Sequence, residues 1–372
     1  MGCAPSEEVR DLYEGEYNAD GQRHGQGKLS FANGDEYEGS WNRGTMHGFG
    51  KKTWKDGHIY EGMWECNKRS GEGKFMSITG ECYEGECAND MAYGHGKMTY
   101  ANGDEYVGEW VNDEREGTGK VTFAESASTY EGCFHKDKQH GYGKFVSGTS
   151  GDQYVGTWVE DRMEGQGRYV YKNGTIYEGN FRNNVIEGEG TTTSANGDVY
   201  KGGYKNEKMD GQGTFTWADS SSYTGTWLEG TFHGFGTMKT TNGDTYEGRY
   251  EMGEKHGKGK YTWRNGATYT GDYVKGLRTG HGIFVYEKKG IRQEGQWING
   301  KFQEEEQAAE PVEASPVKSG GEVEEDKENR QACSPLRLMT LEKKSKIPQP
   351  VMKAHKTIPS KALESSDIQL TM

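Results

Sequence analysis

One pattern recurs along most of this chain and restricts what it can fold into. It consists of an aromatic residue, any residue, Gly, any residue and a second aromatic residue, followed further along by Gly-x-Gly. A fixed period of this length is typical of stacked supersecondary units, so we expect one repeat array instead of the two or three globular domains usual for 372 residues. At spacings of 23 or 24 residues, the pattern opens at Tyr13, Tyr37, Tyr60, Tyr83, Tyr106, Tyr130, Tyr154, Tyr177, Tyr200, Tyr223, Tyr246 and Tyr269, with a partial copy at Gln293.

Within a repeat the residues alternate as they do in a strand with one buried face. Tyr106, Gly108 and Trp110 share a face, because side chains two residues apart point the same way. The apolar residues of segment 117–123 alternate in the same manner, and the intervening positions are mostly polar or charged. Each repeat is therefore predicted to be a β-hairpin with one aromatic face and one wet face. We expect Gly108 to leave room for an aromatic side chain from a neighbouring strand.

The sequences between repeats contain turn signals. Asn-Gly pairs such as Asn33-Gly34 and Asn102-Gly103 favour tight hairpin turns at these places. The chain is thus predicted to be all-β, an elongated and twisted single antiparallel sheet of about twelve to thirteen hairpins. About 25 strands at about 4.8 Å each would extend on the order of 120 Å. An aromatic face left open on such a sheet would require cover, which predicts a homo-oligomer.

The repeated residues resemble the MORN repeat (membrane occupation and recognition nexus). The second repeat carries Tyr37, Gly39 and Trp41, and the same repeat continues through the segment 44–50 with Gly, His and Gly-x-Gly at the family's positions. The resemblance covers residues 13–301 and implies a rod-shaped scaffold without catalytic activity. Some units depart from the pattern: Cys87 stands for the second aromatic residue, and Ser70, Glu116, Glu164, Glu187 and Asp210 replace the histidine.

The N-terminal segment, residues 1–12, carries a lipidation signal. Met1 to Ser6 match the template for N-myristoylation of Gly2, and the adjacent Cys3 is a candidate for palmitoylation. One myristoyl chain binds a bilayer only marginally, so a stable anchor needs a second signal. Acidic residues follow in place of a basic cluster, and Cys3 is therefore the residue expected to supply that signal.

The composition changes after the array, in residues 302–372. Residues 303–328 hold ten acidic residues against two lysines, and residues 329–361 hold eight basic residues against Glu342. Charge, Pro and Ser dominate and aromatic residues are scarce, which predicts a disordered tail that is first acidic and then basic.

Short motifs in the tail suggest partners and regulation. Ser345, Lys346, Ile347 and Pro348 match the Ser-x-Ile-Pro motif that microtubule end-binding proteins recognise. Ser315 and Ser334 each precede a proline and are candidate sites for proline-directed phosphorylation.

The sequence offers no set of residues that indicates catalysis, a metal, a cofactor or a small-molecule substrate. Gly-x-Gly recurs only inside the repeats, so it does not indicate a phosphate loop. The recurring histidines are about 10 Å or more apart in such a sheet, too far to share a metal. The net charge of −13 argues against nucleic acid. The histidines at the shared repeat position are His24, His47, His140, His233 and His256.

These observations predict a non-enzymatic scaffold on the cytoplasmic face of a membrane, anchored through its acyl chains and bound to cytoskeletal proteins, end-binding proteins among them. Two alternatives stay open. One is a structural subunit of a ciliary or flagellar axoneme, similar to radial-spoke-head proteins. The other is a phosphoinositide-binding module, which the acidic array disfavours.

Overall fold

The computed structural model describes residues 10–304, and these residues form strands almost throughout. All 26 strands belong to one open antiparallel sheet, as the repeat period predicts. The only helical element in this range is a short 3-10 helix, η1 (Glu287–Lys289). Within residues 10–304 no helix has the length and hydrophobicity that crossing a bilayer requires. The described residues divide into two compact units, 10–185 and 186–304.

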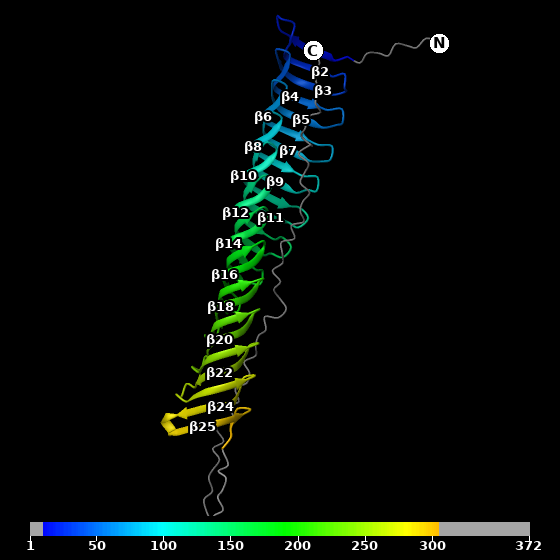
Figure 1. Cartoon of the computed structure of the whole chain (residues 1–372). Coiled ribbons are helices and arrows are strands. Elements are labelled where there is room, and N and C mark those ends of the chain that lie inside the picture. Colours follow the sequence, from blue (N-terminus) through cyan, green and yellow to red (C-terminus); the bar gives the residue numbers. More distant parts are fainter. Residues whose placement is uncertain (1–9, 305–372) are drawn as a thin grey trace, which may run out of the picture. The chain divides into compact units, whose positions relative to one another are not determined.

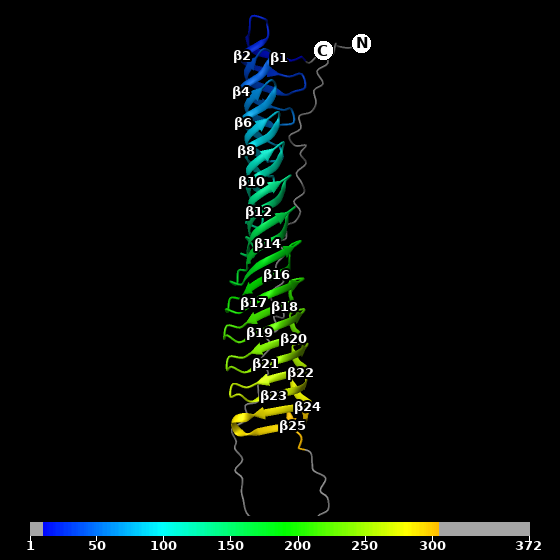
Figure 2. The same ribbon diagram turned by 60° about the vertical axis from the view of Figure 1, so that its left-hand side comes forward.

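In the first unit each strand pairs with the next one along the chain, and Figures 1 and 2 show the strands stacked in chain order from β1 onward. The fifteen strands are β1 (Leu12–Tyr17), β2 (Arg23–Ser30), β3 (Glu36–Asn42), β4 (Thr45–Thr53), β5 (Ile59–Glu65), β6 (Lys68–Met76), β7 (Cys82–Ala88), β8 (Met91–Thr99), β9 (Glu105–Val111), β10 (Glu114–Phe123), β11 (Ser128–His135), β12 (Lys138–Val146), β13 (Gln153–Val159), β14 (Arg162–Val170) and β15 (Ile176–Arg182).

The second unit repeats this arrangement and carries η1 between its last two long strands. Its strands are β16 (Val185–Thr193), β17 (Val199–Lys205), β18 (Lys208–Thr216), β19 (Ser222–Leu228), β20 (Thr231–Lys239), β21 (Thr245–Glu251), β22 (Glu254–Thr262), β23 (Thr268–Val274), β24 (Leu277–Tyr286), β25 (Ile291–Ile298) and β26 (Lys301–Phe302).

The tyrosine that opens each repeat lies flat over two glycines of its own hairpin. Gly39 and Gly50 are cross-strand partners, and a Cβ atom on Gly50 would lie 2.2 Å from the Tyr37 hydroxyl. The same hydroxyl donates a hydrogen bond to the backbone oxygen of Ser40 at 2.9 Å. The space beside Gly39 is thus filled by the tyrosine two residues earlier in the same strand. The expectation at Gly108 is corrected in the same way, because Tyr106 covers both Gly108 and its partner Gly119.

Aromatic residues of consecutive repeats interlock. The Tyr37 ring is edge-to-face with Trp41 of its own repeat at 5.1 Å and with Trp64 of the next repeat at 5.5 Å. The Trp64 indole donates a hydrogen bond to the backbone oxygen of Gly50, at 3.0 Å. Tyr37 and Tyr60 are completely buried as a result. The sheet covers its aromatic face with its own rings, so the homo-oligomer loses the physical reason from which it is predicted, although it stays a prediction.

The tightest turns lie inside the repeats, which corrects the expectation for the Asn-Gly pairs. Cys66 and Asn67 join β5 to β6 in two residues, both with positive φ (50° and 69°), as a type I′ turn requires. Asn33-Gly34 instead lies in a longer loop between repeats, closed by backbone hydrogen bonds from Phe31 to Asp35 and from Gly34 to Phe31. A longer loop is needed there because it crosses from one hairpin to the next.

The second turn residue also fastens neighbouring repeats together. The Asn67 side chain accepts a hydrogen bond from the Met46 amide of the preceding repeat at 2.8 Å. The Asp90 side chain does the same for the Arg69 amide at 2.9 Å, and also accepts from the Arg69 guanidinium. Asn and Asp are favoured at this turn position for two reasons: they tolerate a positive φ, and their side chains carry a hydrogen-bond acceptor.

Candidate docking surface

The hairpin of β3 and β4 contains a bulge at its Gly-x-Gly segment. In β4 the residues 47–49 lie opposite the single residue Ser40, between the paired positions Gly39–Gly50 and Trp41–Met46. Gly48 in this bulge has φ +69°, and Gly50 lies under the tyrosine ring. Of the three residues in Gly-x-Gly, only the middle one can therefore carry a side chain without strain. In β4 that residue is Phe49, and it is exposed.

We call the surface opposite the tyrosine rings the charged face. From β1 to β8 its central row alternates in sign along neighbouring strands, because Lys28, Lys51 and Lys74 each have a Glu as cross-strand partner on both sides. The glutamates that follow the repeat tyrosines thus alternate with lysines of the neighbouring strands. The row runs through Glu14, Lys28, Glu38, Lys51, Glu61, Lys74, Glu84 and Lys97.

Ion pairs in this row are exposed and contribute little stability. Lys74 Nζ lies 2.5 Å from Glu84 Oε1, with about half of each side chain exposed. Their hydrogen bond raises the pKa of Lys74 and lowers the pKa of Glu84. Both groups are therefore charged at neutral pH, and the row presents fixed charges of both signs to solvent.

Valines interrupt the row further along the first unit. Val107 takes the place of a glutamate between Lys97 and Lys120, and Val155 does so between Lys144 and Arg168. Val107 is 52% exposed. The charged face thus acquires apolar positions where the alternation of charges stops.

Three exposed aromatic side chains occupy the middle of Gly-x-Gly. They are Phe49 (57% exposed) and Tyr142 (65%) in the first unit and Phe235 (64%) in the second. Neighbours in this set are 93 residues apart, which is four repeats. Phe49 and Tyr142 lie on β4 and β12, eight strands apart, which corresponds to about 38 Å at about 4.8 Å per strand.

The aromatic positions differ in what stands opposite them. Phe49 is the cross-strand partner of Met63, which is itself 42% exposed, so the two form an apolar pair on the charged face. Tyr142 faces Thr157, and the neighbouring rung pairs Lys144 with Val155. Rings and aliphatic side chains among charges of both signs are suited to a protein surface rather than to a small molecule.

The shared histidine position has a structural role. Where a carboxylate replaces the histidine, it accepts a hydrogen bond from a backbone amide in the turn of the next repeat. Glu116 Oε2 accepts from the Lys136 amide at 2.9 Å, and Glu164 Oε2 accepts from the Asn183 amide at 2.9 Å. Hydrogen bonds from His135 and Lys136 lower the pKa of Glu116. Among residues 10–304, His, Cys, Asp and Glu side chains form no group of three or more that could hold a metal ion.

The site residues predicted in the termini lie outside the described residues. These are Gly2, Cys3, Ser315, Ser334, Ser345, Lys346, Ile347 and Pro348. They stay predictions. The exposed aromatic residues, in contrast, are described but were missed by the sequence analysis. A comparison of the middle residues of all Gly-x-Gly copies could have found them, since most of those residues are polar.

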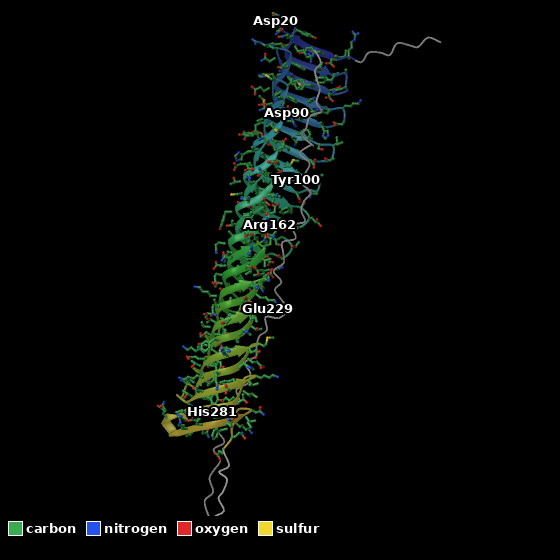
Figure 3. The ribbon with its side chains drawn as sticks, in the orientation of Figure 1. Asp20, Asp90, Tyr100, Arg162, Glu229 and His281 are labelled. Atoms are coloured by element: carbon green, nitrogen blue, oxygen red, sulfur yellow. The ribbon has the colours of Figure 1, made fainter. Side chains whose placement is uncertain are left out.

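Side chains project outward from the strands along each unit (Figure 3), among them the labelled His281, which is the middle residue of the last Gly-x-Gly. The charged face is therefore a series of similar positions repeated at the spacing of the hairpins. Such a surface offers many weak contacts to a protein partner, with anchors where an aromatic ring is exposed.

Comparison with protein families finds the MORN repeat. Its model matches twelve consecutive segments, residues 13–36, 37–59, 60–82, 83–105, 106–127, 130–151, 154–176, 177–199, 200–222, 223–245, 246–268 and 269–290. No curated protein matches the chain.

Solved structures resemble the chain only distantly. One is the TCP domain of SAS-4 (dCPAP) of Drosophila melanogaster in complex with a proline-rich motif of Ana2, with 16% identity over 54% of this chain and 94% of that one, and a TM-score of 0.26. Another is the G-box domain of the microcephaly protein CPAP, with 11% identity over 58% of this chain and 99% of that one, and a TM-score of 0.20. Superpositions this poor carry no argument about function.

Proposed function

The chain belongs to the MORN-repeat family, and from that premise we propose that it is a non-catalytic scaffold that holds cytoskeletal proteins at the cytoplasmic face of a membrane. In this proposal the array supplies the docking surface, acyl chains on Gly2 and Cys3 supply the anchor, and residues 345–348 recruit a microtubule end-binding protein.

The observation that supports docking by the array is the set of exposed rings on the charged face. More than half of Phe49 and of Tyr142 is in solvent, so these rings bury little area within the fold. Large exposed aromatic residues are typical anchors of protein interfaces. Their equal position in the repeat means that both rings project from the same place in the hairpin, although Phe49 faces Met63 and Tyr142 faces Thr157.

Proximity labelling in cells tests this role of the array. The variant Phe49→Ser with Tyr142→Ser should lose proteins that the parent chain labels. A matched control exists in Gln26→Ser with Gln166→Ser, because these residues occupy the same position of Gly-x-Gly in other repeats. Equal partner lists for both variants and the parent would reject docking through the rings.

The anchor and the tail motif have separate tests. A reporter fused to residues 1–12 should move from the membrane to the cytosol when Gly2→Ala is introduced. Labelling of end-binding proteins should be lost in Ile347→Ala and kept in the Phe49→Ser, Tyr142→Ser variant. Resistance of the full chain to detergent extraction, together with retention on microtubules, would instead favour the axonemal alternative.

A further inference from the structure

The end of the array differs in charge from the rest of it. Residues 254–301 carry ten Lys and Arg against four Glu and Asp, a net of +6, although the whole chain is at −13. The exposed part of this charge includes Lys288 and Lys289 in η1 and Arg292 at the start of β25. We call these three residues the basic edge.

The basic edge is largely without carboxylate partners in the part of the chain that the structure describes. Lys288 and Lys289 are exposed and form no ion pair there, while Arg292 pairs with Glu294 on its own strand at 2.7 Å. Lys289 Nζ lies 5.8 Å from the centre of the Tyr286 ring. The lysines thus present their charge to solvent at the last loop before the array ends.

The last strand leaves most of its outer edge open. β26 is only two residues long and pairs with β25 at Trp297–Phe302 and Ile298–Lys301, and one further hydrogen bond joins Gln303 to Gln296. Phe302 packs on Trp297, with ring centres 5.4 Å apart, and covers Gly295. The backbone of residues 291–294 has no strand beside it on that side within the described range. Open strand edges are a hazard that proteins commonly cover.

The direction of β26 determines where the chain goes next. Because β26 is antiparallel to β25, its direction from Lys301 to Phe302 points back along β25 toward Ile291 and η1. From Phe302 to Glu310 there are eight residues, which span at most about 28 Å when extended. The remaining part of β25 is shorter than this, so residues 304–313 can reach the basic edge.

The segment that follows is strongly acidic. Residues 303–328 hold ten Glu and Asp against two Lys, a net of −8. The five acids nearest the array are Glu304, Glu305, Glu306, Glu310 and Glu313. They follow in the chain shortly after β26, so the linker to the basic edge is short and the effective concentration of one charge set at the other is high.

We propose that residues 304–313 of this chain bind the basic edge of Lys288, Lys289 and Arg292, and so cover the open side of β25. The contact is electrostatic and intramolecular. It neutralises the one exposed lysine pair at the end of the second unit, and it holds the start of the tail against the array. The function proposed above does not depend on it.

Zero-length carbodiimide cross-linking of the full chain, followed by mass spectrometry, tests the contact, because this reagent joins a lysine to a carboxylate only where they touch. Lys288 or Lys289 should become linked to Glu305, Glu306, Glu310 or Glu313. Lys205 is the control, since it is also exposed but lies on β17, eight strands from β25. Mixing isotopically labelled and unlabelled chains separates links within one chain from links between chains.

The expected result is an intramolecular link from Lys288 or Lys289 at least tenfold more abundant than any from Lys205 to the same segment, and lost in 0.5 M salt, where screening is strong (about 4 Å Debye length). Links as rare as those of Lys205, or links only between chains, would overturn the proposal.

A charge exchange provides a second measurement. Lys288→Glu with Lys289→Glu should raise the hydrogen exchange of the amides of residues 291–296 by about tenfold or more, and Glu305→Lys with Glu306→Lys and Glu310→Lys should restore protection. Exchange that is unchanged in the first variant contradicts the contact.

Flotation with vesicles rich in anionic lipid is the third measurement. If the parent chain binds the vesicles through Lys288 and Lys289 as strongly as a chain ending at 304 does, the edge serves a membrane and the intramolecular contact is rejected.

Discussion

The indole of Trp64 donates a hydrogen bond to the backbone oxygen of Gly50, which belongs to the preceding repeat, at 3.0 Å. The same contact recurs along the chain, for example from Trp41 to Gly27 at 3.1 Å and from Trp297 to Gly282 at 3.2 Å. Where a repeat carries Trp as its second aromatic residue, it is thus joined to the preceding repeat by a ring that packs on that repeat's tyrosine and by an indole N–H that binds a backbone oxygen. In these repeats the contact holds neighbouring hairpins at a fixed spacing.

Removal of this contact should lower the free energy of unfolding, and more so the more of the Trp64 side chain is removed. Trp64→Phe loses the donor and part of the ring, and we expect about 1–2 kcal/mol of destabilisation. Trp64→Ala leaves a cavity between two tyrosines and should cost about 3–5 kcal/mol. Urea unfolding followed by circular dichroism measures both. A cost for Trp64→Phe as large as that for Trp64→Ala would mean that the hydrogen bond, and not the packing, dominates.

Gly50 should tolerate no side chain. A Cβ atom there would lie 2.2 Å from the Tyr37 hydroxyl, and the ring cannot move because it is buried between Trp41 and Trp64. We expect Gly50→Ala to destabilise the protein by about 3 kcal/mol or more. Gly80→Ala is the control: Gly80 has φ +90° but nothing within 4 Å, so only backbone strain of about 1 kcal/mol applies. Equal urea midpoints for the two variants would contradict the steric argument.

The hairpins and the buried face follow directly from the sequence. Tyr60 and Trp64 are predicted to share a face with Gly62, and the structure buries both rings. This is possible because a period of two residues is visible wherever glycines and rings alternate. The repeat period likewise gives the order of the hairpins.

Other features cannot be read from such alternation. The bulge at Gly48 inserts residues without changing the spacing of the repeats, so the sequence period does not reveal it. The tight turn at Cys66-Asn67 contains no glycine, and its positive φ values are recognisable only once Asn or Asp is seen to recur at the second position. Phe49, in contrast, shares the face of Lys51 by plain alternation, so its exposure could have been found by comparing the middle residues of the Gly-x-Gly copies.

Tyr250 occupies the position of the second aromatic residue but leaves its hydroxyl without a hydrogen-bond partner, although the residue is only 5% exposed. Burial of an unsatisfied hydroxyl is unfavourable, so we expect Tyr250→Phe to stabilise the protein by about 1 kcal/mol. Tyr204 is the matched control, because its hydroxyl shares a hydrogen bond with Thr192 Oγ1. Tyr204→Phe should destabilise. Thermal unfolding of the two variants should therefore shift in opposite directions, and a shift in the same direction would contradict this account.

The turn residue that binds the Met46 amide differs from the one that binds the Arg69 amide. Met46 is fastened by Asn67, whereas the buried Arg69 is fastened by Asp90. The Arg69 guanidinium also lies over the rings of Tyr60 and Phe75, at 5.7 and 5.5 Å from their centres. Asp90 thus places a carboxylate beside the buried guanidinium of Arg69.

The pair Arg69–Asp90 should be replaceable by the pair Met–Asn only when both residues are changed together. Asp90→Asn keeps the acceptor for the Arg69 amide but removes the Asp90 carboxylate from beside the buried guanidinium, and we expect a cost of about 2–3 kcal/mol. The double variant Arg69→Met with Asp90→Asn recreates the pair found one repeat earlier and should recover most of that loss. Urea midpoints of the parent, both single variants and the double variant form the required cycle. Additive effects would show that the two side chains act independently.

Alkaline pH should weaken the array, because its core contains groups that are neutral only when protonated. Burial raises the pKa of the Cys87 thiol from 9.0 to about 11 and the pKa of Tyr100 from 10.0 to about 12. A pKa raised by folding contributes stability that is complete below the unfolded pKa and is lost as pH rises through the folded one. For Cys87 this window lies between about pH 9 and pH 11, and the loss is on the order of 2 kcal/mol.

Urea midpoints measured across this window should fall, and they should fall less steeply in Cys87→Ala. Cys66→Ala, which removes an exposed thiol, is the control. A slope that is the same for Cys87→Ala and for the parent chain would show that the Cys87 thiol does not contribute to the alkaline loss.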